Sequence, residues 1–298
     1  MKFDLSTWFP IASVSDLPYR HVFQGQLLGR EYAIWRADDG NINIWENRCL
    51  HRGVRLSIGI NEGSELKCQY HGWRYANRTA GCTYIPAHPA DAPARTICNN
   101  TYACQEKYGM IFICFDSESQ LDIDDHLGNM APSLDIWELN QLCFIGEREW
   151  VIAENWKRAL DVLCDAYCFD VEQEACETNN RFKHAVGYEQ FGPINQHHRM
   201  TFPNGNIIKL KDLGEQEWGE SAEEGFKISH FLFPNVALTI SKSTVEWLAV
   251  YPGEHCDEQV LRLRSYNRVN ENGMEEENDC LLYTSPSPRD ATRSRMPS

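Results

Sequence analysis

The stretch that decides the fold runs from Cys49 to His71 and reads CLHRGVRLSIGINEGSELKCQYH. It contains two Cys-plus-His pairs, Cys49 with His51 and, after a gap of sixteen residues, Cys68 with His71. Thiolates and imidazoles are common protein ligands of transition metals. The sequence therefore predicts a metal site that is built from two loops.

Two kinds of metal centre fit two Cys and two His ligands. One is a 2Fe-2S cluster in which thiolates bind one iron and imidazoles bind the other. This ligand set raises the reduction potential to roughly −150 to +300 mV, against about −400 mV for all-Cys plant-type clusters. The other is a structural zinc ion with tetrahedral ligands. The single residue between Cys49 and His51 is a shorter gap than zinc-finger pairs use, which favours the cluster.

The residues that flank the two pairs indicate a family. The letters RG follow His51 directly, and GWRY follow His71. This pattern resembles the Rieske domain of ring-hydroxylating oxygenases, whose signature is Cys-x-His-Arg-Gly, a short gap and Cys-x-x-His-Gly-Trp. The resemblance implies a 2Fe-2S cluster in which Cys49 and Cys68 hold the inner iron. His51 and His71 would then hold the outer iron, which faces the electron acceptor.

The net charge and the number of Cys residues limit the classes of partner and the cellular compartment that the sequence predicts. The formal net charge of −15 argues against nucleic acid or an anionic membrane as a partner. No apolar run reaches the roughly 18 residues that span a bilayer, and the start MKFD lacks the plan of a secretory signal. The twelve Cys are therefore expected to be reduced thiols and metal ligands, and the expected location is cytoplasmic.

We expect an α+β chain with two domains. A small all-β Rieske 2Fe-2S domain is predicted at 31–118, with a hairpin of strands at 31–35 and 41–45 and a buried strand at 110–115. A catalytic-type domain with an antiparallel sheet and flanking helices is predicted at 119–279. The stretch 116–135, which spans the boundary between the two domains, has no clear period and is interpreted as the link out of the Rieske domain. Residues 1–30 are interpreted as a leader that packs on the catalytic-type domain, as the resemblance implies.

Residues 280–298 differ from the rest of the chain. Their sequence, CLLYTSPSPRDATRSRMPS, looks like one reading frame of a sequencing adapter. We therefore expect this segment to be non-biological and the gene product to be truncated. A natural Ser/Pro-rich disordered tail is the alternative.

The predicted helix at 154–176 departs from the family pattern. In these oxygenases, an Asn-Trp-Lys start leads to Asp-x-Tyr-His and then to a second His. With a distant carboxylate, the two His side chains hold a mononuclear Fe(II) that has open positions for dioxygen. Here NWK begins at Asn155 and Asp165 is present, but Cys168 and Gln173 occupy the two His positions. The third ligand would lie beyond the start of the adapter-like segment.

The same helix carries a second expectation. The family Asp that matches Asp165 links the cluster of one subunit to the iron site of the next. By carry-over, Asp165 would bridge to His71 of an adjacent subunit in a trimeric ring, and a plain surface carboxylate is the alternative. Asp161, Asp165, Cys168 and Glu172 form one helical stripe, which leaves open an altered metal site or a polar surface.

Three functions remain open from the sequence. The first is a terminal oxygenase component, in which a ferredoxin or a flavin-dependent reductase reduces the cluster for dioxygen-dependent hydroxylation or demethylation of a small organic substrate. It implies a homotrimer or a hetero-oligomer. The second is an inactive Rieske electron-transfer or partner subunit without the mononuclear iron, which Cys168 and Gln173 favour. The third is a zinc-stabilised binding module.

Overall fold

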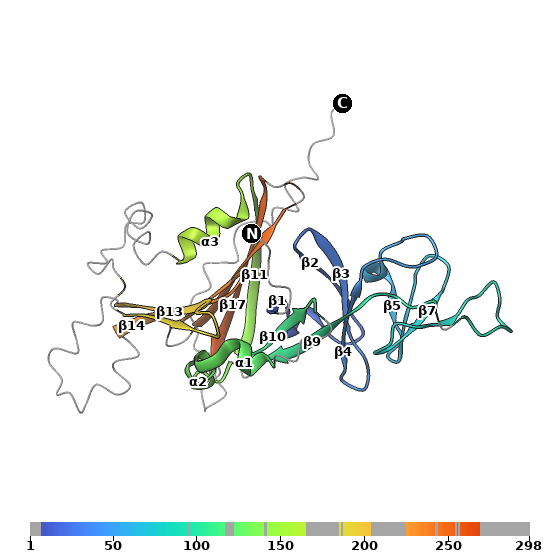
Figure 1. Ribbon diagram of the computed structural model, residues 1–298, viewed down its shortest axis with the longest axis horizontal. Coiled ribbons are helices and arrows are strands. Elements are labelled where there is room, and N and C mark those ends of the chain that lie inside the picture. Colours follow the sequence, from blue (N-terminus) through green and yellow to red (C-terminus); the bar gives the residue numbers. More distant parts are fainter. Residues whose placement is uncertain are drawn as a thin grey trace. The chain divides into compact units, whose positions relative to one another are not determined.

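The computed structural model describes residues 7–94, 96–116, 122–139, 142–164, 185, 187–203, 225–241, 244–253, 255 and 257–268. It divides the chain into two compact units, Met1–Gly128 and Asn129–Ser298, which contain different sheets (Figure 1). The expected α+β class is confirmed, because antiparallel sheets dominate both units and the described helices are few and short. The boundary between the units lies later than the predicted one at 118.

The first unit contains a six-stranded antiparallel sheet of order β1-β10-β9-β4-β3-β2. Its strands are β1 (Trp8–Ser13), β2 (Val22–Leu27), β3 (Arg30–Arg36), β4 (Ile42–Glu46), β9 (Thr101–Lys107) and β10 (Met110–Cys114). The predicted hairpin is confirmed as β3 and β4, and the predicted buried strand is β10, in which every residue is buried. Trp35 and Trp45 meet edge to face at the centre of the unit, with ring centroids 5.2 Å apart.

Strands β1 and β2 lie in the stretch that the sequence analysis assigns to a leader on the second domain. The structure corrects this assignment, because both strands belong to the sheet of the first unit. All six residues of β1 are buried, and Trp8 pairs with Cys114 of β10. Since β10 is buried along its whole length, its backbone groups need a strand on each side, and β1 supplies the second one.

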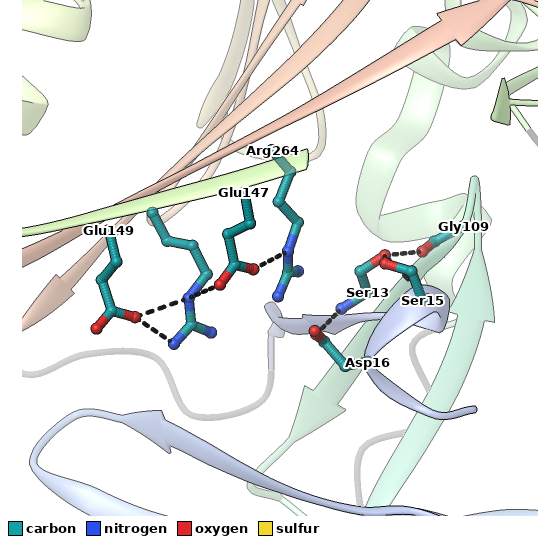
Figure 2. A network of polar contacts seen from close by, with 8 residues as sticks. Ser13, Ser15, Asp16, Gly109, Glu147, Glu149 and Arg264 are labelled. Carbon is teal, nitrogen blue, oxygen red and sulfur yellow. Dashed lines mark hydrogen bonds and ion pairs between the residues drawn. The ribbon is translucent and has the colours of Figure 1, made fainter. Parts of the chain in front are cut away.

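Ser13 fixes the point where β1 ends (Figure 2). Its side chain accepts a hydrogen bond from the N–H of Ser15, and its own N–H donates to the carboxylate of Asp16 at 2.8 Å. This capping box begins a short 3-10 helix, η1 (Val14–Asp16). The Ser13 hydroxyl also donates to the carbonyl of Gly109 at 3.4 Å, just before β10. The turn therefore stays attached to the strand with which β1 pairs.

A four-stranded sheet of order β5-β6-β7-β8 completes the first unit. Its strands are β5 (Ile60–Asn61), β6 (Glu65–Lys67), β7 (Arg74–Ala76) and β8 (Cys82–Tyr84), and η2 (Leu56–Ile58) precedes them. Leu66 of β6 and Tyr75 of β7 are fully buried, in one apolar cluster with Cys49 and Cys68. The two Cys of the predicted metal site therefore lie at the edge of a packed core.

The second unit contains a seven-stranded antiparallel sheet of order β11-β17-β16-β15-β14-β13-β12. Its strands are β11 (Leu142–Ile152), β12 (Gly187–Phe191), β13 (His197–Pro203), β14 (Phe226–Leu232), β15 (Val236–Ile240), β16 (Thr244–Pro252) and β17 (Gln259–Arg268). The antiparallel sheet that the sequence predicts for this domain is confirmed. Glu147 of β11 pairs with Arg264 of β17 at 2.7 Å (Figure 2), and Arg262 pairs with Glu149 at 2.8 Å. These pairs join the first and last strands of the unit.

The segment 116–135, which we interpret from its sequence as an irregular link, contains short helices. They are α1 (Ile123–Leu127), η3 (Gly128–Met130) and α2 (Ala131–Asp135). Asp122 caps α1, because its carboxylate accepts a hydrogen bond from the N–H of Asp124 at 2.8 Å. Helices of this length contain too few residues to show a 3.6-residue period.

The predicted helix after Asn155 is present as α3 (Trp156–Cys164). Its half-buried residues recur at helical spacing, at Trp156, Ala159, Leu160 and Leu163, as the sequence predicts. No helix within the described part of the chain is long and apolar enough to cross a membrane.

Candidate metal centre

Both Cys-plus-His pairs lie on loops that repeat the same backbone hydrogen bonds. In the first loop, the N–H of Cys49 donates to the carbonyl of Val54 at 2.8 Å, and the N–H of Gly53 donates to the carbonyl of Cys49 at 2.8 Å. In the second loop, Cys68 makes the equivalent bonds, at 2.8 and 3.0 Å, with Trp73 and Gly72. Each loop is therefore a closed turn that presents a Cys and a His on a fixed backbone.

A glycine with positive φ closes each turn. Gly53 has φ 70° and Gly72 has φ 71°, a conformation that costs little only for glycine. Space is also short, because a Cβ on Gly53 would lie 2.9 Å from Nε of Arg48. A Cβ on Gly72 would lie 3.2 Å from Cγ of Pro86. The two glycines are thus required by backbone conformation and by close packing.

The four predicted ligands fall into two pairs. Cys49 and Cys68 are buried, with exposed fractions of 3% and 2%. His51 and His71 are exposed, and the centroids of their rings are 4.8 Å apart. The ring of Trp73 stacks on His51 at 5.1 Å with an interplanar angle of 8°. The thiols therefore face the core, whereas the imidazoles face solvent.

Tyr75 connects this site to the core of the first unit. Its hydroxyl lies 3.2 Å from Sγ of Cys49 and accepts a hydrogen bond from the N–H of Leu50 at 3.1 Å. Burial holds the pKa of the Tyr75 phenol far above its usual range, so the hydroxyl keeps its proton. It can therefore donate that proton to a thiolate sulfur at position 49.

The pKa of the second thiol, that of Cys68, is shifted in opposite directions by its surroundings. Burial raises the pKa of Cys68, and the backbone N–H groups of Tyr70 and His71 act in the opposite direction by donating to its sulfur. A bound metal ion converts such a thiol to a thiolate. The two N–H groups are then placed to stabilise the charged sulfur.

The pairwise arrangement fits a 2Fe-2S cluster. Within the described residues, no group of three or more His, Cys, Asp or Glu side chains is placed to hold one metal ion. A tetrahedral zinc site needs four ligands around one ion, whereas a Rieske cluster takes two protein ligands on each of two irons. The buried thiols suit one iron and the exposed imidazoles suit the other.

Other sequence-predicted site residues lie elsewhere. Asp165, Cys168 and Gln173 lie outside the described residues, as does the segment 280–298. Asp161 lies on α3 and is exposed, so only one member of the predicted stripe of acidic and thiol side chains is described.

Two histidines of the second unit, His198 and His230, pack among structural neighbours. Nε2 of buried His230 lies 3.1 Å from the hydroxyl of Ser133 in α2, which accepts a hydrogen bond from Arg199 at 2.7 Å. The ring of His198 stacks on Phe231, with centroids 4.9 Å apart. Ser133 therefore connects α2 to β13 and β14.

Two features of the first unit were missed by sequence reasoning. One is the hydrogen bond between Tyr75 and Cys49. The other is a pair of surface pockets beside the first loop, which share Glu46 and Arg48 in their lining. Both depend on contacts between strands that are distant in the sequence. The only available signal was the position of a Tyr four residues after His71.

Comparison with known proteins supports the cluster assignment. Residues 7–103 match the Rieske [2Fe-2S] domain. The chain is 55% identical over 111 residues to the oxidoreductase NdmD of Pseudomonas putida, covering 37% of this chain and 19% of NdmD. It is 31% identical over 115 residues to the methylxanthine N1-demethylase NdmA of the same organism, covering 37% of this chain and 32% of NdmA. These matches thus span less than a third of each relative.

The similarity in structure extends further along the chain. The quaternary ammonium Rieske monooxygenase CntA superposes with a TM-score of 0.68 at 15% identity, over 91% of this chain and 71% of CntA. At this identity the likeness concerns the fold. Residues 7–103 of the chain therefore contain a Rieske [2Fe-2S] domain, and the fold is similar to that of a Rieske monooxygenase.

Proposed function

We propose that this chain is the terminal oxygenase component of a Rieske non-haem iron system. The observation that carries the proposal is the division of the ligand set into buried thiols, Cys49 and Cys68, and exposed imidazoles, His51 and His71. The match to the Rieske domain and the fold shared with a Rieske monooxygenase support it.

In this proposal each residue of the two loops has a defined task. Cys49 and Cys68 hold the inner iron inside the core, where apolar neighbours exclude water from the sulfur atoms. His51 and His71 hold the outer iron at the surface. The cluster, when bound, accepts and releases one electron at a time. Tyr75 donates a hydrogen bond to the sulfur of Cys49 and so stabilises its negative charge.

The proposal includes partners and a second iron. A ferredoxin or a flavin-dependent reductase supplies electrons, and the reaction is hydroxylation or demethylation of a small organic substrate with dioxygen. Asp165 carries electrons between subunits of a homotrimer or a hetero-oligomer, as in the family pattern. The names of two similar proteins, a demethylase and a monooxygenase, support this range of reactions.

A second candidate is a Rieske electron-transfer or partner subunit that lacks the mononuclear iron. The observation that favours it is the presence of Cys168 and Gln173 where the family pattern has two His. Neither side chain offers the neutral imidazole on which the facial site of dioxygen-activating Fe(II) depends.

The metal content of the anaerobically reconstituted protein separates the two candidates. An oxygenase component should contain about three irons for two acid-labile sulfides, because one iron lies outside the cluster. An electron carrier should contain about two irons for two sulfides. A ratio of two to two that persists in excess Fe(II) contradicts the oxygenase proposal. His71→Ala should remove the Rieske absorbance and paramagnetic signals in both cases.

A further inference from the structure

A groove runs along the surface of the first unit towards the first metal loop. It consists of two adjoining pockets of about 470 and 380 Å³ that share Glu46 and Arg48. Arg30 and Tyr32 line the first pocket, and His51 and Arg52 line the second. We call it the cationic groove. It ends at one of the two exposed ligands of the proposed cluster.

The charges of the groove are opposite in sign to those of the chain. Arg30, Arg48 and Arg52 are exposed, and none of them forms an ion pair with another described residue. Of the two carboxylates in the lining, Glu31 accepts hydrogen bonds from Nε and Nη2 of Arg55, each at 2.7 Å. An excess of positive charge therefore lies here, on a chain whose formal net charge is −15.

The other carboxylate of the lining is held in place by a neighbour. Glu46 accepts a hydrogen bond from the side chain of Asn100 at 2.7 Å. The wall between the charged side chains is rigid, because the buried Tyr32 ring packs edge to face against Tyr102, with centroids 5.2 Å apart. The arginines are therefore presented from a fixed surface.

The ligand chemistry follows from these donors. A carboxylate accepts charge-assisted hydrogen bonds from guanidinium groups, often two at a time. Arg48 also lies directly against Gly53, where a Cβ would be 2.9 Å from its Nε. A carboxylate held by Arg48 is therefore held next to the first metal loop.

The surroundings of the imidazoles resemble the centre of a protein interface. Leu50 and Tyr70 are 45% and 57% exposed, and each is adjacent in sequence to one of the two His ligands. The Tyr70 ring also lies on His71, with centroids 3.7 Å apart. Apolar and aromatic side chains at the centre with charged groups at the rim are typical of protein–protein interfaces.

We propose that the cationic groove is the docking site for an acidic segment of the protein that reduces the cluster. A carboxylate of that donor binds the exposed guanidinium groups of Arg30 and Arg48. The proposal rests on the proposed function, because it needs a redox cluster at the end of the groove. In the complex the donor loses one electron and the cluster gains it, and no proton or group moves. The rest of this acidic chain repels an acidic donor protein. The donor is therefore attracted only at the groove, which fixes its orientation on the surface.

The rate of cluster reduction tests this proposal. Oxidised holo-protein is mixed in a stopped-flow instrument with a reduced, acidic plant-type 2Fe-2S ferredoxin at several salt concentrations. The double variant Arg30→Gln/Arg48→Gln should react about tenfold more slowly at low salt, and the difference should shrink as salt screens the charges. Glu46→Gln removes a negative charge from the groove and should act in the opposite direction, with faster reduction.

Arg78→Gln is the matched control, because it removes one positive charge of the same unit outside the groove. Arg78 is 63% exposed and pairs with Asp39 at 3.0 Å. Ferredoxin should reduce the Arg78→Gln variant at the same rate as the unchanged protein. Equal rates for the groove variants and Arg78→Gln at low salt would overturn the proposal. A calorimetric result could also overturn the proposal. If free glutarate binds in a way that depends on Arg30 and Arg48, and the ferredoxin rate does not change in the groove variants, the pocket binds a small molecule instead.

A second reductant separates this proposal from the proposed function. Methyl viologen radical is small and cationic, so it does not need the groove. It should reduce the cluster at the same rate in the groove variants and in the unchanged protein. If it reduces no cluster in any of them, the Rieske assignment fails. If it reduces all of them equally and the ferredoxin rate is also insensitive to the groove, only the docking proposal fails.

Discussion

Single side chains set the properties of the proposed cluster, and Tyr75 is the clearest case. Its hydroxyl lies 3.2 Å from Sγ of Cys49. A hydrogen bond to a cluster sulfur stabilises the reduced, more negative state. Tyr75→Phe should therefore lower the midpoint potential by about 50 mV, which corresponds to roughly 1 kcal/mol in a one-electron couple. Tyr84→Phe, at an exposed position of β8, is the control. Equal potentials in the two variants would contradict this role of Tyr75.

Buried histidines make the second unit sensitive to acid. Burial lowers the pKa of His198 to about 4 and that of His230 to about 3, whereas an unfolded His titrates near about 6.5. Below that pH the unfolded state binds protons that the folded state does not. The free energy of unfolding is therefore at its full value above about pH 6.5 and falls as the pH drops towards 4.

Urea denaturation at pH 7.5 and at pH 5 measures this loss. The urea midpoint should be lower at pH 5. In His198→Phe, which keeps an aromatic ring against Phe231, part of the pH dependence should disappear. A variant with the full dependence of the unchanged protein would show that His198 is not one of the groups responsible.

The sequence predicts the four cluster ligands because their spacing and flanking letters are local in the sequence, and their assignment stays a prediction. The partners of those ligands could not be predicted. Tyr75 contacts Cys49 only because the fold brings β7 next to the first loop. Tyr32 and Arg48 come together only because β3 pairs with β4. Side-chain pairs of this kind depend on the register of the sheet, which a single sequence does not specify.

Among the structural elements, the two metal loops depend most directly on backbone conformation. Gly53→Ala and Gly72→Ala should each lower the iron content after reconstitution and destabilise the first unit by about 1–2 kcal/mol, because φ is positive at both positions. Gly81→Ala is the control. Its Cβ would meet Thr79 at an ordinary 3.5 Å, and its φ is not in the left-handed region.

The iron content and thermal unfolding of the three variants measure this effect. The two loop variants should lose similar amounts of iron, because φ is 70° at Gly53 and 71° at Gly72, and the exposed Arg48 side chain can move away from a Cβ on Gly53. Full iron content in both loop variants would show that the loops tolerate a different turn.

The sequence predicted the secondary-structure elements that have a strong hydrophobic pattern. It did not predict which sheet an apolar strand joins, nor the positions of very short helices. The hairpin β3–β4 and the buried strand β10 were predicted from a turn signal and from a short apolar run. The run that begins at Trp8 is equally apolar, but nothing in its sequence indicates which sheet it joins, and it pairs with β10. The short helices α1 and α2 were missed because neither is long enough to display a period.

For the molecule as a whole, the identity of the metal centre decides which functions are possible. The fold, the match to the Rieske domain and the arrangement of the four ligands agree on a 2Fe-2S cluster. The cationic groove and the effect of Tyr75 both presuppose it. The two functional candidates differ in the second iron but share this centre.

The midpoint potential of the reconstituted protein tests this central assignment most directly, measured together with its iron and sulfide content. Mixed Cys and His ligation predicts about two cluster irons and two sulfides per chain, and a potential within roughly −150 to +300 mV. A colourless protein that holds zinc without sulfide would contradict the assignment. A potential near about −400 mV would also contradict it, because it would mean that Cys residues alone ligate the cluster.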